Sequence, residues 1–146
     1  MIDYNRTLQL FYAGVLADSV KYYDKAGILG IVTEEKRKQQ EVAAAAQLKQ
    51  LDIKSVSELF EEFSKIFGCI NWEVKTAKTK TTAHGKSCLL CSISKRMGTA
   101  QPCFLYCINP FKALINHINS EYTLKINQTL WESDQCIFEV LNTLEK

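Results

Sequence analysis

The stretch "EYTLKINQTLWESDQCIFEVLNTL", residues 121–144, decides the fold class of this chain. Apolar and polar residues alternate over 121–130 and again over 136–144, which is typical of strands that bury one face. The polar segment "WESDQ" between them suits a turn. The sequence therefore predicts a late β-hairpin with strands at 121–130 and 136–144.

A further strand is predicted at 70–82, "INWEVKTAKTKTT". Ile70, Trp72 and Val74 alternate with polar residues, and threonine and tryptophan favour strands. Lys78 and Lys80 fall in register with those apolar residues, so we expect them on the same face of the strand.

The rest of the chain has helical periodicity. Helices are expected at about 3–26, 33–51, 55–67, 88–97 and 110–119. Asp3, Thr33, Ser55 and Asn109 are the residue types that cap helix N-termini, and each stands next to one of these ranges. The apolar stripe of the first helix, at a spacing of three to four residues, consists of Leu8, Phe11, Tyr12, Val15, Tyr22 and Tyr23.

The length of 146 residues is typical of one domain, and we expect residues 1–146 to form one. Helices dominate the first half of the chain and strands the second. The predicted fold class is α+β: a helical N-terminal half packed on a small, mainly antiparallel β-sheet with a late β-hairpin.

Composition and charge exclude several classes of function. The net charge of +2 argues against a nucleic-acid binder, which usually carries a strongly basic face. The sequence has no apolar run of the roughly 18–20 residues that span a membrane. Acids and tyrosines interrupt the apolar part of the N-terminus, unlike a signal peptide. We therefore expect a cytoplasmic protein whose thiols stay reduced.

Four of the six cysteines fall within "KSCLLCSISKRMGTAQPCFLYC", residues 86–107. Cys88 and Cys91 are one helical turn apart, and so are Cys103 and Cys107. Two such pairs provide four soft ligands for one tetrahedral ion, which favours zinc as the metal. Iron or an iron–sulfur cluster accepts the same four thiolates. Burial as small apolar side chains is the alternative, and it is the more common role of free cysteine.

The same segment also suits thiol catalysis. Cys103 follows Pro102 at the expected start of a helical turn, and Cys88 stands at the start of another, where free N–H groups lower a thiol pKa. His84 lies in a turn-like segment nearby and is the candidate general base. Lys78, Lys80 and Lys86 are candidates for binding a substrate carboxylate, with a solvated basic face as the alternative.

The order "GCINWEV", "SCLLC", "QPCFLYCINPFKAL" and "TLWESDQCIFEV" resembles the L-2-amino-thiazoline-4-carboxylic acid hydrolase-like family over roughly residues 66–140. In this resemblance Cys88 and Cys91 match the first cysteine segment, Cys103 and Cys107 the middle one, and Cys136 the late strand. The chain is more distantly similar to sensor domains of the 4-vinyl reductase type. Both resemblances imply helices against an antiparallel sheet.

Three functions follow as hypotheses. The first is a hydrolase that opens a small cyclic amidine such as 2-aminothiazoline-4-carboxylate, with Cys103 or Cys88 as nucleophile or three ligands on a metal. The second is a small-molecule or metal-binding sensor domain of the 4-vinyl reductase type. The third is an interaction module without chemistry that forms a homodimer through its long N-terminal helices.

Overall fold

The computed structural model describes residues 1–142 of the chain. The helices are α1 (Tyr4–Lys25), α2 (Leu29–Gln50), α3 (Val56–Phe67), α4 (Leu89–Met97), the π-helix η1 (Phe104–Ile108) and α5 (Asn109–Ile118). The strands are β1 (Glu73–Thr76), β2 (Lys80–Gly85), β3 (Tyr122–Gln128) and β4 (Cys136–Asn142). All neighbouring strands are antiparallel, in the order β1-β2-β4-β3. The α+β prediction is confirmed.

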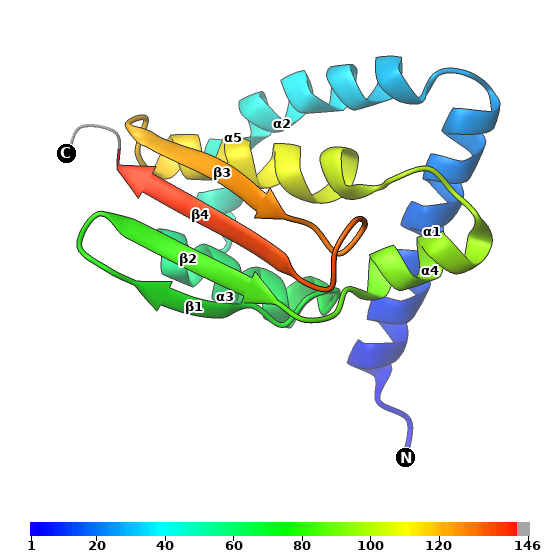
Figure 1. Cartoon of the computed structure of the whole chain (residues 1–146), viewed down its shortest axis with the longest axis horizontal. Helices are drawn as coiled ribbons and strands as arrows, with labels where there is room; N and C mark the ends of the chain where they lie inside the picture. The colour runs from blue at the N-terminus through cyan, green and yellow to red at the C-terminus, as the bar shows by residue number, and fades with distance from the viewer. Residues whose placement is uncertain (143–146) are drawn as a thin grey trace.

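The helices cover one face of the sheet, and the other face is open (Figure 1). Helices α3 and α5 lie directly against the strands, and α2 packs on α5. Helix α1 stands at one side of the molecule, where it packs on α4. From residue 1 to residue 142, no helix combines the length and the apolar character needed to span a membrane.

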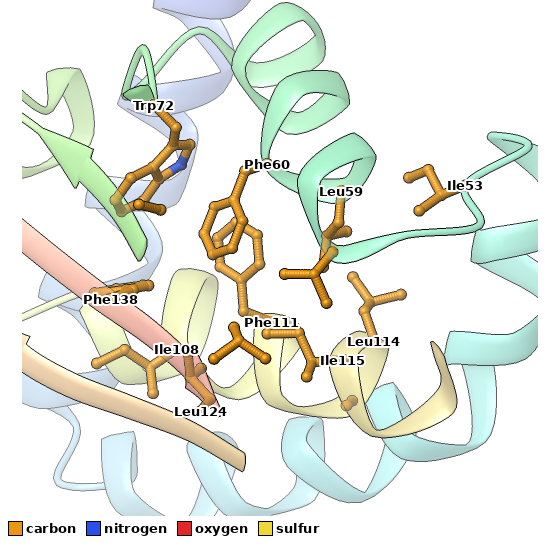
Figure 2. Close-up of a cluster of buried hydrophobic side chains, with 14 of the residues drawn as sticks. Ile53, Leu59, Phe60, Trp72, Ile108, Phe111, Leu114, Ile115, Leu124 and Phe138 are labelled. Carbon is orange, nitrogen blue, oxygen red and sulfur yellow. The ribbon is translucent and has the colours of Figure 1, made fainter. Parts of the chain in front are cut away.

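Aromatic rings from both halves of the chain fill the space between helices and sheet (Figure 2). Phe60 of α3 stacks on Phe111 of α5 with ring centroids 4.8 Å apart. Trp72 packs against Phe60 at 5.2 Å and against Phe138 of β4 at 4.9 Å. Rings arranged at these distances add stability beyond the area that they bury. This cluster joins the helical half of the chain to the late hairpin.

Two of the predicted helix starts are confirmed by their caps. The Asp3 carboxylate accepts a hydrogen bond from the Arg6 N–H at 3.0 Å, and the Ser55 hydroxyl accepts one from the Glu58 N–H at 3.1 Å. Thr33 is not a cap. Helix α2 begins four residues earlier at Leu29, and the Thr33 hydroxyl donates to the Leu29 carbonyl from inside the helix.

The strand predicted at 70–82 is in fact divided between two strands of a hairpin, β1 and the start of β2. The chain turns at residues 77–79, where the Ala77 N–H donates to the Lys80 carbonyl at 2.8 Å. Strand β2 then runs back beside β1 and includes His84. As a result Lys78 lies in the turn, and Lys80 lies on a different strand from Val74, while Trp72 lies just before β1.

The last predicted hairpin is present, with strands slightly shorter than expected. A bulge between Ile126 and Gln128 ends β3, so Leu130 is outside the strand. Thr143 and Leu144, the predicted end of the last strand, lie outside the described residues. The helix predicted at 110–119 has no separate start, because η1 continues directly into α5 and Asn109 does not cap it.

Helix α1 has two apolar faces. The face that points into the molecule carries the small residues Ala13 and Ala17 with Val20, all completely buried. The larger apolar residues lie on the other side: Leu8, Phe11 and Val15 expose 69%, 71% and 62% of their surface. Most of the stripe recognised in the sequence therefore faces solvent.

Candidate functional site

All six cysteines gather at one end of the sheet, although they come from four separate segments. Cys69 follows α3, Cys88 and Cys91 start α4, Cys103 and Cys107 belong to the η1 segment, and Cys136 starts β4. The thiols lie close enough together for a charge on one to oppose the ionisation of another. The ionisation of Cys107 is opposed by Cys88, Cys103, Cys136 and Cys69. The chain thus places a thiol cluster between α4, η1 and the β2–β4 end of the sheet.

Burial keeps these thiols protonated. Desolvation raises the pKa of Cys103 to about 11 and that of Cys107 well above its ordinary value. Burial also raises the pKa of Cys88, although its sulfur accepts a hydrogen bond from the Cys91 N–H at 3.4 Å. The Cys136 sulfur accepts one from the Leu130 N–H at 3.1 Å, and its pKa is raised by burial as well. The expected lowering of the pKa at Cys88 and Cys103 is therefore outweighed by desolvation.

The donor set is chemically suited to a soft metal ion, because thiolates are the preferred ligands of zinc. In the part of the chain that the structure describes, no three histidine, cysteine, aspartate or glutamate side chains are arranged so that they could hold one. The zinc or iron site stays a prediction. Its ligands would be Cys88, Cys91, Cys103 and Cys107.

His84 lies on the opposite face of the sheet from the thiols. Its neighbours Ala83 and Gly85 are buried against the helices, and side chains alternate along a strand. His84 therefore points to the open face, beside Ile137 in the register of β2 and β4. Cys136 pairs with Gly85 and is buried on the inner face. The structure does not bring His84 to a cysteine sulfur.

The candidate lysines are also separated from the thiols. Lys80 pairs with Leu141 at one end of β2, whereas Cys136 lies at the other end, about 17 Å away at roughly 3.3 Å per residue. Lys80 forms an ion pair with Glu139 at 3.5 Å. Lys78 and Lys80 line a hollow of about 230 Å³ that has no cysteine in its wall. Lys86 lies nearer the thiols but is exposed, with its ammonium 3.7 Å from the Glu73 carboxylate.

A second hollow, of about 500 Å³, lies where α1, the end of α3 and the start of α4 meet. Cys69 and Cys88 are in its wall, together with Arg6. The Leu89 N–H donates to the Cys69 carbonyl at 2.8 Å, which joins the start of α4 to the segment after α3. Burial raises the pKa of Cys69, while the Leu90 N–H and the Arg6 charge act in the opposite direction.

Several large exposed apolar residues lie on α1. We use "outer face of α1" for the residues Tyr4, Leu8, Phe11, Val15 and Tyr22, all of which are exposed. They recur at spacings of four, three, four and seven residues, so they form one continuous stripe along the helix. Single exposed apolar residues are common, but a contiguous stripe of this kind marks an interaction surface.

Sequence reasoning identified most residues of the outer face of α1 but not that they face solvent. The signal that distinguishes it is a strict seven-residue repeat, whereas Ala13, Ala17 and Val20 form a separate face of small residues. Sequence reasoning also left Cys69 out of the candidate site. Its neighbour Gly68, in the left-handed conformation at the end of α3, was the available signal for the turn toward α4.

Comparison with known proteins adds one result on the fold. No protein-family model and no curated protein matches the chain. A solved structure is similar to it. This is a crystal structure of a trafficking protein particle complex subunit 3 from Naegleria fowleri, covalently bound to palmitic acid. The match has a TM-score of 0.59 and 12% identity, and it covers 93% of this chain and 95% of the other. At this identity the similarity establishes a shared fold.

Proposed function

We propose that this chain is a protein-interaction subunit that binds its partner through the outer face of α1. The observation that carries the proposal is the burial pattern of that helix. Its buried face consists of Ala13, Ala17 and Val20, while Leu8, Phe11 and Val15 face solvent. The similar solved structure is described as a subunit of a complex, and it has the same arrangement of helices and strands over nearly its full length.

An exposed apolar stripe has a cost in free energy and a composition that favour an interaction surface. An apolar side chain left in water forgoes roughly 1.5–3 kcal/mol of the stabilisation that burial provides. Tyrosine and phenylalanine, which recur on the outer face of α1, are enriched where proteins bind one another. An interaction surface is consistent with this composition, whereas a purely structural helix would carry polar residues on this side.

The proposal is tested by placing a photo-reactive phenylalanine analogue at Phe11 in the full chain, in the cells that make the protein. Val42 of α2 is the matched control position, because it is 85% exposed and apolar but lies outside the stripe. We expect a protein cross-link from Phe11, either to a second copy or to another protein, and none from Val42. Equal or absent cross-linking at both positions would contradict the proposal.

A second candidate function is attachment of an acyl chain at Cys69. It is favoured by the position of this thiol in the wall of the 500 Å³ hollow, within reach of the Leu90 N–H at the start of α4. The similar solved structure carries a covalently bound palmitic acid. In such a step the Cys69 sulfur attacks the carbonyl carbon of an acyl thioester, and the coenzyme leaves as a thiol that takes up the Cys69 proton.

Incubation of the full chain with palmitoyl-coenzyme A tests this candidate by mass spectrometry. We expect one acyl group per chain that hydroxylamine removes, present in Cys136→Ser and absent from Cys69→Ser. Acylation that persists in Cys69→Ser, or none in the wild type, would remove the candidate.

The cyclic-amidine hydrolase and the sensor domain remain predictions with weaker support. Hydrolysis would use a thiol or metal, a base and a carboxylate-binding lysine in one place. In residues 1–142 the thiols, His84 and Lys80 occupy three different places. We also propose a cytoplasmic location for the chain.

A further inference from the structure

We infer that the partner of the outer face of α1 is a second copy of this chain, bound in an antiparallel orientation. This inference rests on the proposed interaction function and adds the identity and direction of the partner. It is carried by the spacing of the stripe, by the charges within it and by its area.

The stripe has the spacing of a coiled-coil seam. Tyr4, Leu8, Phe11, Val15 and Tyr22 alternate steps of four and three residues once Asp18 is included, and Lys25 continues the same series. All seven positions are exposed. A repeat of seven residues keeps one seam facing a second helix along its whole length. A long helix with this seam is complementary to a helix with the same seam.

The two charged residues within the seam decide the orientation. In a parallel pair, Asp18 would face Asp18 of the partner subunit, and Lys25 would face the partner's Lys25. Like charges that face each other across a desolvated seam are strongly unfavourable. An antiparallel pair centred between Phe11 and Val15 avoids both contacts while it uses the whole length of the helix.

In that register most apolar residues meet one another, and neither charged side chain meets a like charge. The facing pairs are Phe11 with Val15, Tyr4 with Tyr22, and Leu8 with Asp18, each pair taken across the two copies, and Lys25 lies beyond the start of the partner helix. The helix dipoles are also antiparallel in this arrangement, which is favourable.

The exposed area agrees with the size of a stable dimer. With about 150–250 Å² for each fully exposed aromatic residue and somewhat less for leucine and valine, the outer face of α1 offers roughly 600 Å² of apolar surface per copy. Two copies would bury about 1,200 Å² at the seam alone, the lower end of the range for specific interfaces.

The test uses sedimentation of the full chain over a range of concentrations. We expect the wild type to sediment at twice the 16.6 kDa mass of one chain. Leu8→Glu should raise the dissociation constant at least about 100-fold, because it buries a carboxylate opposite Asp18. The control Val42→Glu should leave the dissociation constant unchanged, and circular dichroism should show that each variant is folded.

The orientation is tested by comparing Leu8→Lys with Leu8→Glu. In the antiparallel dimer the new lysine faces Asp18 of the partner subunit, so Leu8→Lys should bind at least about tenfold more tightly than Leu8→Glu. In a parallel dimer the residue introduced at position 8 faces the same residue of the partner subunit. Leu8→Lys and Leu8→Glu should then have equal dissociation constants. Equal binding would overturn the antiparallel orientation.

The outcomes separate this inference from the proposed function. A wild type that remains a monomer up to about 100 µM, a concentration at which a dimer of micromolar affinity is nearly complete, would overturn the homodimer. Equal dimerisation of the wild type and Leu8→Glu would also overturn it. The cross-linking from Phe11 described above would still report a different protein partner in either case.

Discussion

Phe11 and Ala13 are two residues apart on α1, yet Phe11 exposes 71% of its surface and Ala13 exposes none. The small residue faces the molecule and the large one faces solvent, which reverses the usual distribution of apolar side chains. The reason is that α1 packs on α4 through a face of small residues that includes Ala17. The large residues are thereby left exposed to solvent.

This arrangement predicts that enlarging the buried face of α1 destabilises the fold. Ala17→Leu should lower the free energy of unfolding by about 1–3 kcal/mol, because the helix then no longer fits against the molecule. Ala46→Leu, at an exposed position of α2, should change it by less than about 0.5 kcal/mol. Urea unfolding measures both. Equal effects would mean that α1 does not pack through this face.

The aromatic cluster predicts a large loss of stability at its centre. Phe60 is completely buried and contacts both Phe111 and Trp72. Phe60→Ala should cost about 3–5 kcal/mol, through lost burial and the cavity that remains. Phe104→Ala removes the same side chain at an exposed position of η1, so its cost should stay below about 1 kcal/mol. A small loss in Phe60→Ala would show that the described core is not the one in solution.

Two glycines should respond to alanine in opposite directions. Gly85 pairs with Cys136 in the sheet, and a methyl group on its Cα would collide with the Ile70 side chain. Gly85→Ala should therefore lower the melting temperature. Gly30 lies in α2 with open space around it, so Gly30→Ala should stabilise the protein by about 0.5–1 kcal/mol. Thermal unfolding of the two variants tests the close approach of Ile70 to β2.

Thiol burial predicts a loss of stability in alkali. The pKa of Cys103 is raised by burial to about 11 from an ordinary value near 9, and burial also raises the pKa of Cys107 well above its ordinary value. Above pH 9 the unfolded chain releases these protons while the folded chain keeps them. Stability is therefore complete below about pH 9 and falls as the pH rises through the folded pKa values.

Urea unfolding at about pH 8 and about pH 10.5 measures this effect. The midpoint should fall between the two values, and it should fall less in Cys107→Ala, which has one titrating thiol fewer. Burial also raises the pKa of Tyr12 and Tyr106, so the tyrosines contribute a fall of the same sign to both proteins. An equal fall in both proteins would assign the whole effect to groups other than Cys107.

Local patterns predicted most helices and strands correctly. The alternation in residues 121–142 gave the late hairpin, and Ser55 with Glu58 gave the start of α3, because pleat and cap geometry depend on residues close in sequence. The turn at residues 77–79 was missed since "AKT" contains none of the glycine, proline or asparagine that usually marks a turn. The π-helix was missed because its wider turn leaves no signal of its own in the spacing of apolar residues.

The candidate site depended more on tertiary structure. The cysteine pairs at Cys88 and Cys103 were visible in the sequence, and the fold does bring them together with Cys136. Their high pKa values were not visible, because desolvation depends on every element packed around them. The lysines appeared close to them in the sequence, but antiparallel pairing of β2 and β4 puts Lys80 at the far end of the sheet.

The sequence by itself determined the α+β class, most of the helix and strand positions and one apolar stripe on α1, because these follow from periodicity and capping within short segments. Only the tertiary structure decided which face of α1 is buried. A periodic pattern shows that a helix has an apolar face, but the choice between two such faces depends on the shape of the surface it meets. Here α1 packs on α4, Ala13 and Ala17 are completely buried, and the outer face is left exposed.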